Sequence, residues 1–220
     1  MKRFYVVLGV LAVVLGGMLV YLLTARPGAA PAAVAAPTAV VDDGFRGDTL
    51  GSASAPVEVT EYGDFECPAC AGFATVQMPT IKEQLIAPGK VRWRYRDYPL
   101  PMHPYARLAA HAAQCAGEQG KFWEMHDQLF SNHSWAQTGR DPSRLFRDFA
   151  RATGVDLVRY DACMESGRYA SRIEFSRLEG EQRLVDGTPT FYINGVKYVG
   201  RNNSDAFKAA VDSAAAARRR

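Results

Sequence analysis

A surplus of basic residues is missing from most of this 220-residue sequence. Residues 42–220 carry 23 lysine and arginine side chains against 23 aspartate and glutamate side chains, so the overall charge of +3 lies entirely in residues 1–41. Binding to a nucleic-acid backbone requires a clustered excess of positive charge. The sequence therefore argues against a nucleic-acid partner, and its length is too short for two full-sized domains.

Charged side chains are also absent from residues 4–23, a run of twenty residues that follows Lys2 and Arg3. At about 1.5 Å per residue, such a run spans the roughly 30 Å hydrocarbon core of a bilayer as a helix. We therefore expect residues 1–24 to form a transmembrane anchor with the remaining chain on the extracytoplasmic side, because positive charge keeps the amino end in the cytoplasm. A signal segment cleaved after Ala33-Val34-Ala35 is one alternative, and a buried core helix is another.

Bulky side chains are nearly absent from residues 25–42, which consist mainly of alanine and proline. Such a segment cannot form a hydrophobic core, and its prolines favour extended conformations. We expect it to be a linker that holds the folded part away from the membrane surface. The folded domain is then expected over residues 43–220.

Strand and helix patterns alternate at both ends of this domain. Residues 57–62 and 91–98 alternate in polarity, with a helical pattern between them to about Ile86, which predicts two parallel strands joined by a helix. Residues 190–193 and 197–199 flank Asn194-Gly195, a strong hairpin signal, and a final helix begins near Ser204. Helical patterns dominate the intervening residues 104–184. The sequence therefore predicts an α/β fold with one mixed sheet and a helical insertion.

Two of the four cysteines, Cys67 and Cys70, lie directly after the first predicted strand and at the start of a helix. A helix N-terminus stabilises a thiolate and lowers its pKa below about 8.5. Pro68 suits the first helical position, so we expect Cys67 to be the exposed nucleophile and Cys70 to turn inward as the resolving cysteine. The alternatives are an inert disulfide or half of a zinc site, although the sequence has no second CxxC motif.

Three acidic residues, Glu61, Asp64 and Glu66, lie just before this pair. Negative charge close to Cys67 would oppose a low pKa, whereas an acid close to Cys70 could relay protons to it. The spacer Pro68-Ala69 lacks a histidine, whose positive charge would stabilise the thiolate further. The pattern predicts a moderate oxidant.

The other two cysteines, Cys115 and Cys163, lie within the helical block. If Cys67 pairs with Cys70, one connectivity remains for them, and we expect a second disulfide that stabilises the fold by about 3 to 4 kcal/mol. Two separate buried thiols are the alternative. His111 stands four residues before Cys115, a spacing that can bind metal on a helix, but no further ligands are evident.

Three sequence runs together resemble the DsbA family of thioredoxin-fold thiol:disulfide oxidoreductases, in its membrane-anchored, BdbD-like branch. They are EYGDFECPAC, YPLPMHPYARLAAHAAQCAGEQGKFWEMHDQLF and GTPTFYINGVKYVG, and the resemblance covers residues 45–215. It implies a thioredoxin fold with an inserted helical domain, and it assigns catalysis to Cys67 and Cys70. Thr188-Pro189, which reads as a turn from the residues alone, becomes a cis-proline site where the backbone of residue 188 pairs with substrate.

The resemblance implies an extracytoplasmic enzyme of a prokaryotic cell envelope that works mainly as an oxidase. It would donate the Cys67–Cys70 disulfide to newly exported proteins with free thiols, and a quinone-linked membrane protein of the DsbB or VKOR type would reoxidise it. No metal or organic cofactor is expected, and a monomer is the default. The alternatives are a tethered reductase or disulfide isomerase and a non-catalytic tethered binding module.

Overall fold

The computed structural model describes residues 14–18, 37, 39–200 and 202–218. The predicted anchor at residues 1–24, except for a helical stretch at 14–18, and most of the predicted linker at 25–42 lie outside the described residues, as does Ala33-Val34-Ala35. Among the residues that are described, no helix combines the length and the apolar character that crossing a bilayer requires.

A five-stranded mixed sheet forms the centre of the domain, with the strand order β1-β3-β2-β4-β5. β2 (Val57–Gly63) and β3 (Val91–Asp97) are parallel, and β4 (Thr190–Ile193) runs antiparallel to β2, so the predicted mixed sheet is confirmed. β1 (Asp48–Leu50) pairs antiparallel with β3. The sequence pattern does not predict β1, because three residues are too few to show an alternation.

The closing hairpin joins β4 to β5 (Val196–Lys197). Asn194 and Gly195 both have positive φ, 48° and 83°, as a two-residue turn between twisted strands requires. The second strand starts one residue earlier than predicted and ends at Lys197. The Glu58 amide donates to Asn194 Oδ1 at 2.9 Å, which ties this turn to β2.

One face of the sheet packs against the helical segment that connects β2 to β3. This segment consists of α2 (Pro68–Gly72), η1 (Phe73–Gln77), α3 (Met78–Ile81) and η2 (Lys82–Ile86). The carboxyl-terminal helix α9 (Ser204–Ala217) packs on the same core, where Trp93, Phe191 and Phe207 are buried. The apolar positions of the alternating strands therefore supply one continuous core on this face.

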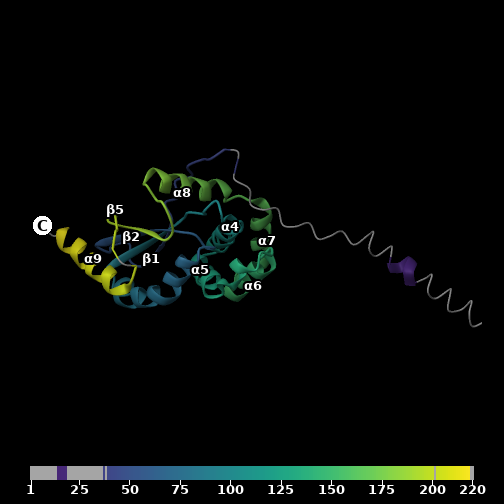
Figure 1. Cartoon of the computed structure of the whole chain (residues 1–220), viewed down its shortest axis with the longest axis horizontal. Helices are drawn as coiled ribbons and strands as arrows, with labels where there is room; N and C mark the ends of the chain where they lie inside the picture. The colour runs from purple at the N-terminus through teal and green to yellow at the C-terminus, as the bar shows by residue number, and fades with distance from the viewer. Residues whose placement is uncertain (1–13, 19–36, 38, 201, 219–220) are drawn as a thin grey trace, which may run out of the picture. The chain divides into compact units, whose positions relative to one another are not determined.

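The opposite face is covered by α8 (Ala170–Gln182), and Figure 1 shows the sheet between α8 and α9. Tyr62, Tyr98 and Tyr192 pack there in a smaller core. A Cβ atom at Gly180 would lie 2.6 Å from the Tyr98 ring, so only glycine allows α8 to approach the sheet this closely.

Helices fill the chain between β3 and β4, and the predicted helical insertion is confirmed. They are α4 (Ala106–Gly117), α5 (Phe122–Ser131), η3 (His133–Gln137), α6 (Ser143–Thr153), α7 (Leu157–Ser166) and α8. Gly154 and Gly167 end α6 and α7 in the left-handed conformation, with φ of 80° and 61°. Asp156 begins α7 by accepting the Val158 amide at 2.8 Å. Short-range sequence signals therefore define the ends of α6 and α7 and the start of α7.

A disulfide between Cys115 on α4 and Cys163 on α7 joins two helices of the insertion across 48 residues of sequence. Both cysteines are buried, and they belong to the core that the insertion shares with α2. Cross-linking a loop of this length removes entropy from the unfolded chain that corresponds to about 4 kcal/mol.

Replacing both cysteines, as Cys115→Ala/Cys163→Ala, is expected to lower the free energy of unfolding by about 4 kcal/mol. Urea unfolding under non-reducing conditions measures the change. The matched control is Cys67→Ala/Cys70→Ala, which keeps the disulfide of the insertion. A loss below about 1 kcal/mol would show that the cross-link contributes little to stability.

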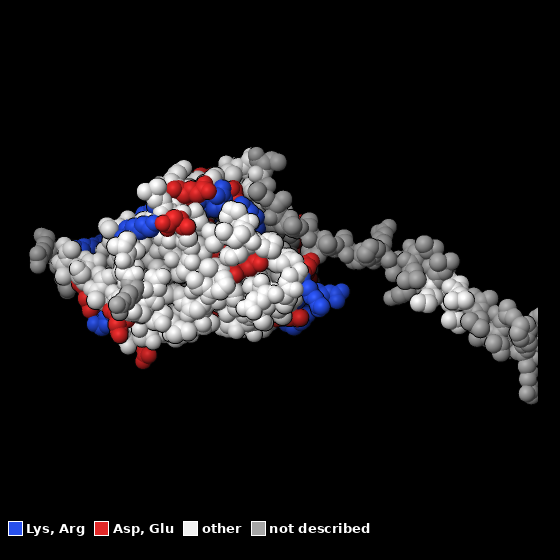
Figure 2. Space-filling view, viewed as in Figure 1, with Lys and Arg blue, Asp and Glu red and all other residues white. Residues whose placement is uncertain are grey.

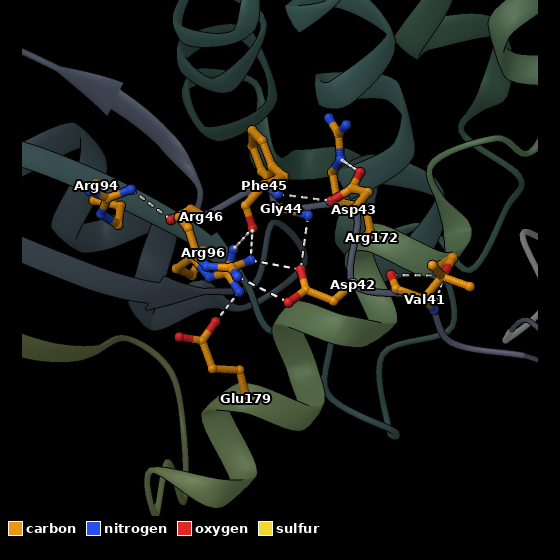
Figure 3. Close-up of polar contacts among 11 residues, drawn as sticks. Val41, Asp42, Asp43, Gly44, Phe45, Arg46, Arg94, Arg96, Arg172 and Glu179 are labelled. Atoms are coloured by element: carbon orange, nitrogen blue, oxygen red, sulfur yellow. Dashed lines mark hydrogen bonds and ion pairs between the residues drawn. The ribbon is translucent and has the colours of Figure 1, made fainter.

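The chain enters the domain through residues 41–46, which contact α8 and β3 (Figure 3). Val41 N donates to Ser171 Oγ at 2.7 Å, and Arg172 Nε donates to Asp43 Oδ2 at 2.8 Å. Arg96, whose side chain is 2% exposed, donates to the Phe45 carbonyl and pairs with Glu179 of α8. These contacts begin two residues before the predicted domain start at Asp43.

The charges of the domain are well mixed on the face shown in Figure 2. Blue and red side chains lie there as small separate groups among uncharged residues. Charged side chains of the domain also pair, such as Arg147 with Asp161 at 2.8 Å and Lys121 with Glu124 at 2.8 Å. This distribution agrees with the neutral composition of residues 42–220.

Candidate active site

Cys67 and Cys70 lie where the turn after β2 passes into α2. Pro68 takes the first helical position and Cys67 the N-cap, with extended backbone at φ −76° and ψ 122°. The Cys67 amide donates to the Asp64 carbonyl at 3.1 Å, and the Ala71 amide donates to the Cys67 carbonyl at 3.1 Å. The predicted start of the helix, with Pro68 at the first helical position directly after Cys67, is therefore confirmed.

Both cysteines are free thiols and both are buried, at 7% exposure for Cys67 and 0% for Cys70. Cys70 turns inward as predicted, but the prediction that Cys67 is exposed is wrong. The reason is the loop before β4, which covers it: Cys67 Sγ lies 3.4 Å from the Thr188 carbonyl oxygen. Only a narrow part of the Cys67 side chain faces solvent.

The Thr188-Pro189 peptide bond is cis, and the loop that contains it lies against Cys67. Thr190 Oγ1 donates to the Gly187 carbonyl at 2.7 Å, which fixes the loop where β4 begins. The structure thus brings Thr188 and Pro189 together with the two cysteines.

The two thiols differ strongly in acidity. A hydrogen bond from Cys70, helped by Thr188 and the backbone amides of Cys70 and Ala69, lowers the pKa of Cys67 from 9.0 to about 5, although burial opposes this shift. Burial raises the pKa of Cys70 well above 9.0, and the neighbouring Cys67 raises it further. At neutral pH, Cys67 is therefore a thiolate and Cys70 a thiol.

Of the three upstream acids, Glu61 is the one whose charge acts on Cys70. Its side chain is buried at 2% exposure, and Glu61 Oε2 accepts the Trp93 indole N–H at 3.0 Å. Burial raises the pKa of Glu61 from 4.5 to about 7, and its charge acts on Cys70. Glu61 can therefore take up or release a proton near neutral pH.

The other two acids hold the loop that follows β3. Asp64 accepts the Glu66 amide at 2.7 Å, the Leu100 amide at 2.9 Å and His103 Nδ1 at 2.7 Å. Glu66 Oε2 accepts the Tyr105 amide at 2.6 Å, at the start of α4. Burial raises the pKa of both carboxyls. They connect the cysteine turn to the insertion.

A histidine near Cys67 comes from the insertion and was not predicted. His133 Nε2 donates to the Phe65 carbonyl at 3.0 Å, and the negative charge of Cys67 acts on its imidazole. Burial lowers the pKa of His133, so it is mainly neutral at pH 7. No local pattern identifies this residue, because it lies far along the chain on a short 3-10 turn.

One cluster of potential metal ligands lies within the helical insertion. Within the described ranges, one group of three could hold an ion: His111, Cys115 and Cys163, whose ligand atoms lie within 4.8 Å of one another. Both sulfurs of this group are bonded to each other, so neither is a thiolate ligand. Cys67 and Cys70 belong to no such group in that part of the chain.

Comparisons with known proteins agree with this geometry. A family model described as thioredoxin matches residues 46–213. The chain is 42% identical over 178 residues to Na(+)/H(+) antiporter NhaA 3 of Salinispora tropica, which covers 80% of this chain but 26% of the antiporter. It is 27% identical over 168 residues to the probable disulfide bond formation protein D of Bacillus cereus, covering 74% of this chain and 76% of that protein.

Among solved structures, oxidised BdbD from Bacillus subtilis superposes with a TM-score of 0.71 at 25% identity. The match covers 77% of this chain and 93% of BdbD. The chain thus spans about a quarter of the length of the antiporter relative and most of the length of the two disulfide-related proteins.

Proposed function

Because this chain belongs to the thioredoxin family, with a DsbA-like fold that carries a helical insertion, we propose that it is an extracytoplasmic thiol:disulfide oxidoreductase acting mainly as an oxidase. The observation that carries the proposal is the difference between the two thiols. Cys67 is acidic, with a pKa of about 5, and lies against Thr188, whereas Cys70 is buried and weakly acidic. The antiporter match covers 26% of that relative, so no transport activity is proposed.

The proposed reaction consists of two thiol–disulfide exchanges. A substrate thiolate attacks Cys67 Sγ of the oxidised enzyme, the Cys67–Cys70 bond breaks, and Cys70 leaves with the electron pair. A second substrate thiolate then attacks the substrate sulfur of the mixed disulfide and releases Cys67 as a thiolate. The substrate gains one disulfide and the enzyme gains two electrons. The second step is favourable because Cys67 is a stabilised leaving group.

Cys70 needs a proton as it leaves, because burial disfavours its thiolate. Glu61 is the acid whose charge acts on it, and a group with a pKa of about 7 can serve as proton donor or acceptor at neutral pH. We propose that Glu61 supplies this proton during substrate oxidation. It would take the proton back when Cys70 attacks during reoxidation.

The proposed substrates are newly exported proteins that still have free thiols. The backbone of Thr188 lies beside Cys67 and next to the start of β4, where an extended peptide can pair by strand addition. A quinone-linked membrane protein of the DsbB or VKOR type is the proposed reoxidant. The proposed location is the extracytoplasmic side of a prokaryotic cytoplasmic membrane, with the enzyme anchored there as a monomer.

The equilibrium between the Cys67–Cys70 pair and a glutathione buffer tests the direction of electron flow. A Cys67 pKa of about 5 lies between the roughly 7 of thioredoxin and the roughly 3.5 of DsbA. The expected reduction potential therefore lies between about −270 and −120 mV. The oxidised enzyme should also form disulfides in a reduced, unfolded substrate protein.

A potential at or below about −270 mV would instead support a reductase. The fully oxidised and fully reduced proteins serve as end points, and acid quenching followed by mass spectrometry gives the ratio of the two forms. The Cys115–Cys163 disulfide should stay closed throughout, because it is buried.

A further inference from the structure

Two buried polar atoms near the cysteine pair have no hydrogen-bond partner within the described residues. They are Glu61 Oε1 and the Tyr95 hydroxyl oxygen. Buried polar groups in native proteins are nearly always paired, so each exception calls for a physical explanation. Tyr95 is 1% exposed, and the mechanism above gives it no role.

The sheet register makes the two residues that carry these atoms direct neighbours. Glu61 on β2 is the direct partner of Tyr95 on the parallel strand β3, so both side chains point to the same face. That face carries α2, because Phe65, Cys70 and Tyr95 belong to one buried core, and the rings of Phe65 and Tyr95 lie 5.1 Å apart.

Gly63 leaves the space that the Tyr95 hydroxyl occupies. A Cβ atom at position 63 would lie 2.7 Å from the hydroxyl oxygen and 2.5 Å from the ring. The tyrosine ring therefore crosses directly over the backbone of β2, two residues beyond Glu61. Its hydroxyl is held under the turn that leads to Cys67.

The titratable groups around Tyr95 come from every element packed against it. The Cys70 thiolate has the largest effect of any charge on the Tyr95 hydroxyl, and burial raises the pKa of Tyr95 well above 10.0. The hydroxyl therefore keeps its proton at neutral pH. The groups that face it are Cys70 on α2, Glu61 on β2, Asp64 in the turn, Asp97 on β3 and His126 on α5.

We propose that the Tyr95 hydroxyl carries the proton between Glu61 and Cys70 during thiol–disulfide exchange. As the Cys67–Cys70 bond breaks, Cys70 leaves with the electron pair and takes a proton from Tyr95, while Tyr95 takes the carboxyl proton of Glu61. Tyr95 ends unchanged, Cys70 ends as a thiol and Glu61 as a carboxylate. The negative charge of the attacking substrate thiolate thus ends on Glu61, and reoxidation reverses the transfer.

A hydroxyl suits this role because it donates and accepts a hydrogen bond at the same time. The Tyr95 hydroxyl makes no direct hydrogen bond to Glu61 or Cys70 within the described residues, so buried waters that bridge Glu61 to Tyr95 and Tyr95 to Cys70 would complete the path. The inference rests on the proposed function, since it assigns a path to a proton that the proposed exchange must move. It makes Tyr95 a positioning and relay residue rather than a nucleophile.

A purely structural role for Tyr95 makes a different prediction. Removing a buried hydroxyl that lacks a partner should raise stability or leave it unchanged, with no effect on exchange rates. Tyr160 offers a matched comparison, because its hydroxyl is also buried and without a partner among the described residues. It lies on α7, which belongs to the insertion.

The experiment compares Tyr95→Phe, Tyr160→Phe, Glu61→Gln and the double variant Tyr95→Phe/Glu61→Gln in the full chain. Rapid mixing of each oxidised protein with reduced glutathione, between pH 5 and pH 8, gives the rate of opening of the Cys67–Cys70 disulfide. General acid catalysis contributes about 10²-fold or more, so Tyr95→Phe should slow this step at least about tenfold. Tyr160→Phe should stay within about twofold of the wild type.

The double variant should be no slower than Glu61→Gln alone, because both residues serve one proton path. Urea unfolding should show Tyr95→Phe to be at least as stable as the wild type, so that slow exchange reports a lost proton path. A Tyr95→Phe rate within about twofold of the wild type, or effects of the two single variants that multiply, would overturn the relay while leaving the proposed function intact. A wild-type protein that fails to react with glutathione would overturn both.

Discussion

The Cys70→Ser variant is expected to accumulate a covalent mixed disulfide on Cys67 and to lose turnover by at least about a thousandfold. Cys67 still reacts, because its thiolate is stabilised by Thr188 and by backbone amides as well as by residue 70. With serine at position 70, the chain has no buried thiol to expel the bound substrate. Non-reducing electrophoresis and mass spectrometry of the trapped protein measure the adduct.

Cys67→Ser is the matched control, since it makes the same chemical change three residues away. It should lose turnover to the same degree and trap no substrate, because Cys70 is 0% exposed and its pKa is raised by burial. Adducts on Cys70 in this variant, at a level similar to those on Cys67 in Cys70→Ser, would show that the roles of nucleophile and resolving cysteine are assigned wrongly.

The stability of the reduced protein is expected to depend on pH in a way that the oxidised protein does not share. The pKa of Cys67 is lowered in the folded state from 9.0 to about 5. A group with a lowered pKa stabilises the folded state fully above its unfolded pKa, and this contribution is lost as the pH falls through the folded pKa. The contribution is therefore about 2 to 3 kcal/mol at pH 7 and close to zero near pH 4.

Urea unfolding of both redox forms between pH 4 and pH 8 measures this difference. Cys67 does not titrate in the disulfide, whereas groups away from the two sulfurs titrate in both forms and largely cancel. The range stops at pH 8 because the raised pKa of Cys70 acts in the opposite direction at higher pH. A difference between the two forms that stays constant across this range would show that Cys67 is not a stabilised thiolate.

The three acids show where sequence reasoning stops. Glu61, Asp64 and Glu66 lie within six residues, and the sequence alone does not separate their roles. The structure does, because alternation along β2 directs Glu61 into the core, where its charge acts on Cys70, whereas Asp64 and Glu66 follow the strand and meet the backbone of the loop after β3. Side-chain direction depends on the face of the sheet that is covered, which only the tertiary fold decides.

The sequence by itself determined the features that depend on neighbouring residues. Pro68 places Cys67 at the start of a helix, Gly154 and Gly167 end helices in the left-handed conformation, and Asn194-Gly195 turns the closing hairpin. Each of these features follows from the backbone preferences of one or two residues. The resemblance to a known family then supplied the role of Pro189, whose local pattern alone indicates no more than a turn.

Only the tertiary structure decided what surrounds the two cysteines. It covered Cys67 with the Thr188 loop, brought His133 from the insertion, and set Tyr95 beside Glu61 by strand register. The acidity of Cys67 depends in part on the Thr188 contact, which joins parts of the chain far apart in sequence. A local pattern carries no information about such contacts, because strand register and helix packing are properties of the whole folded chain.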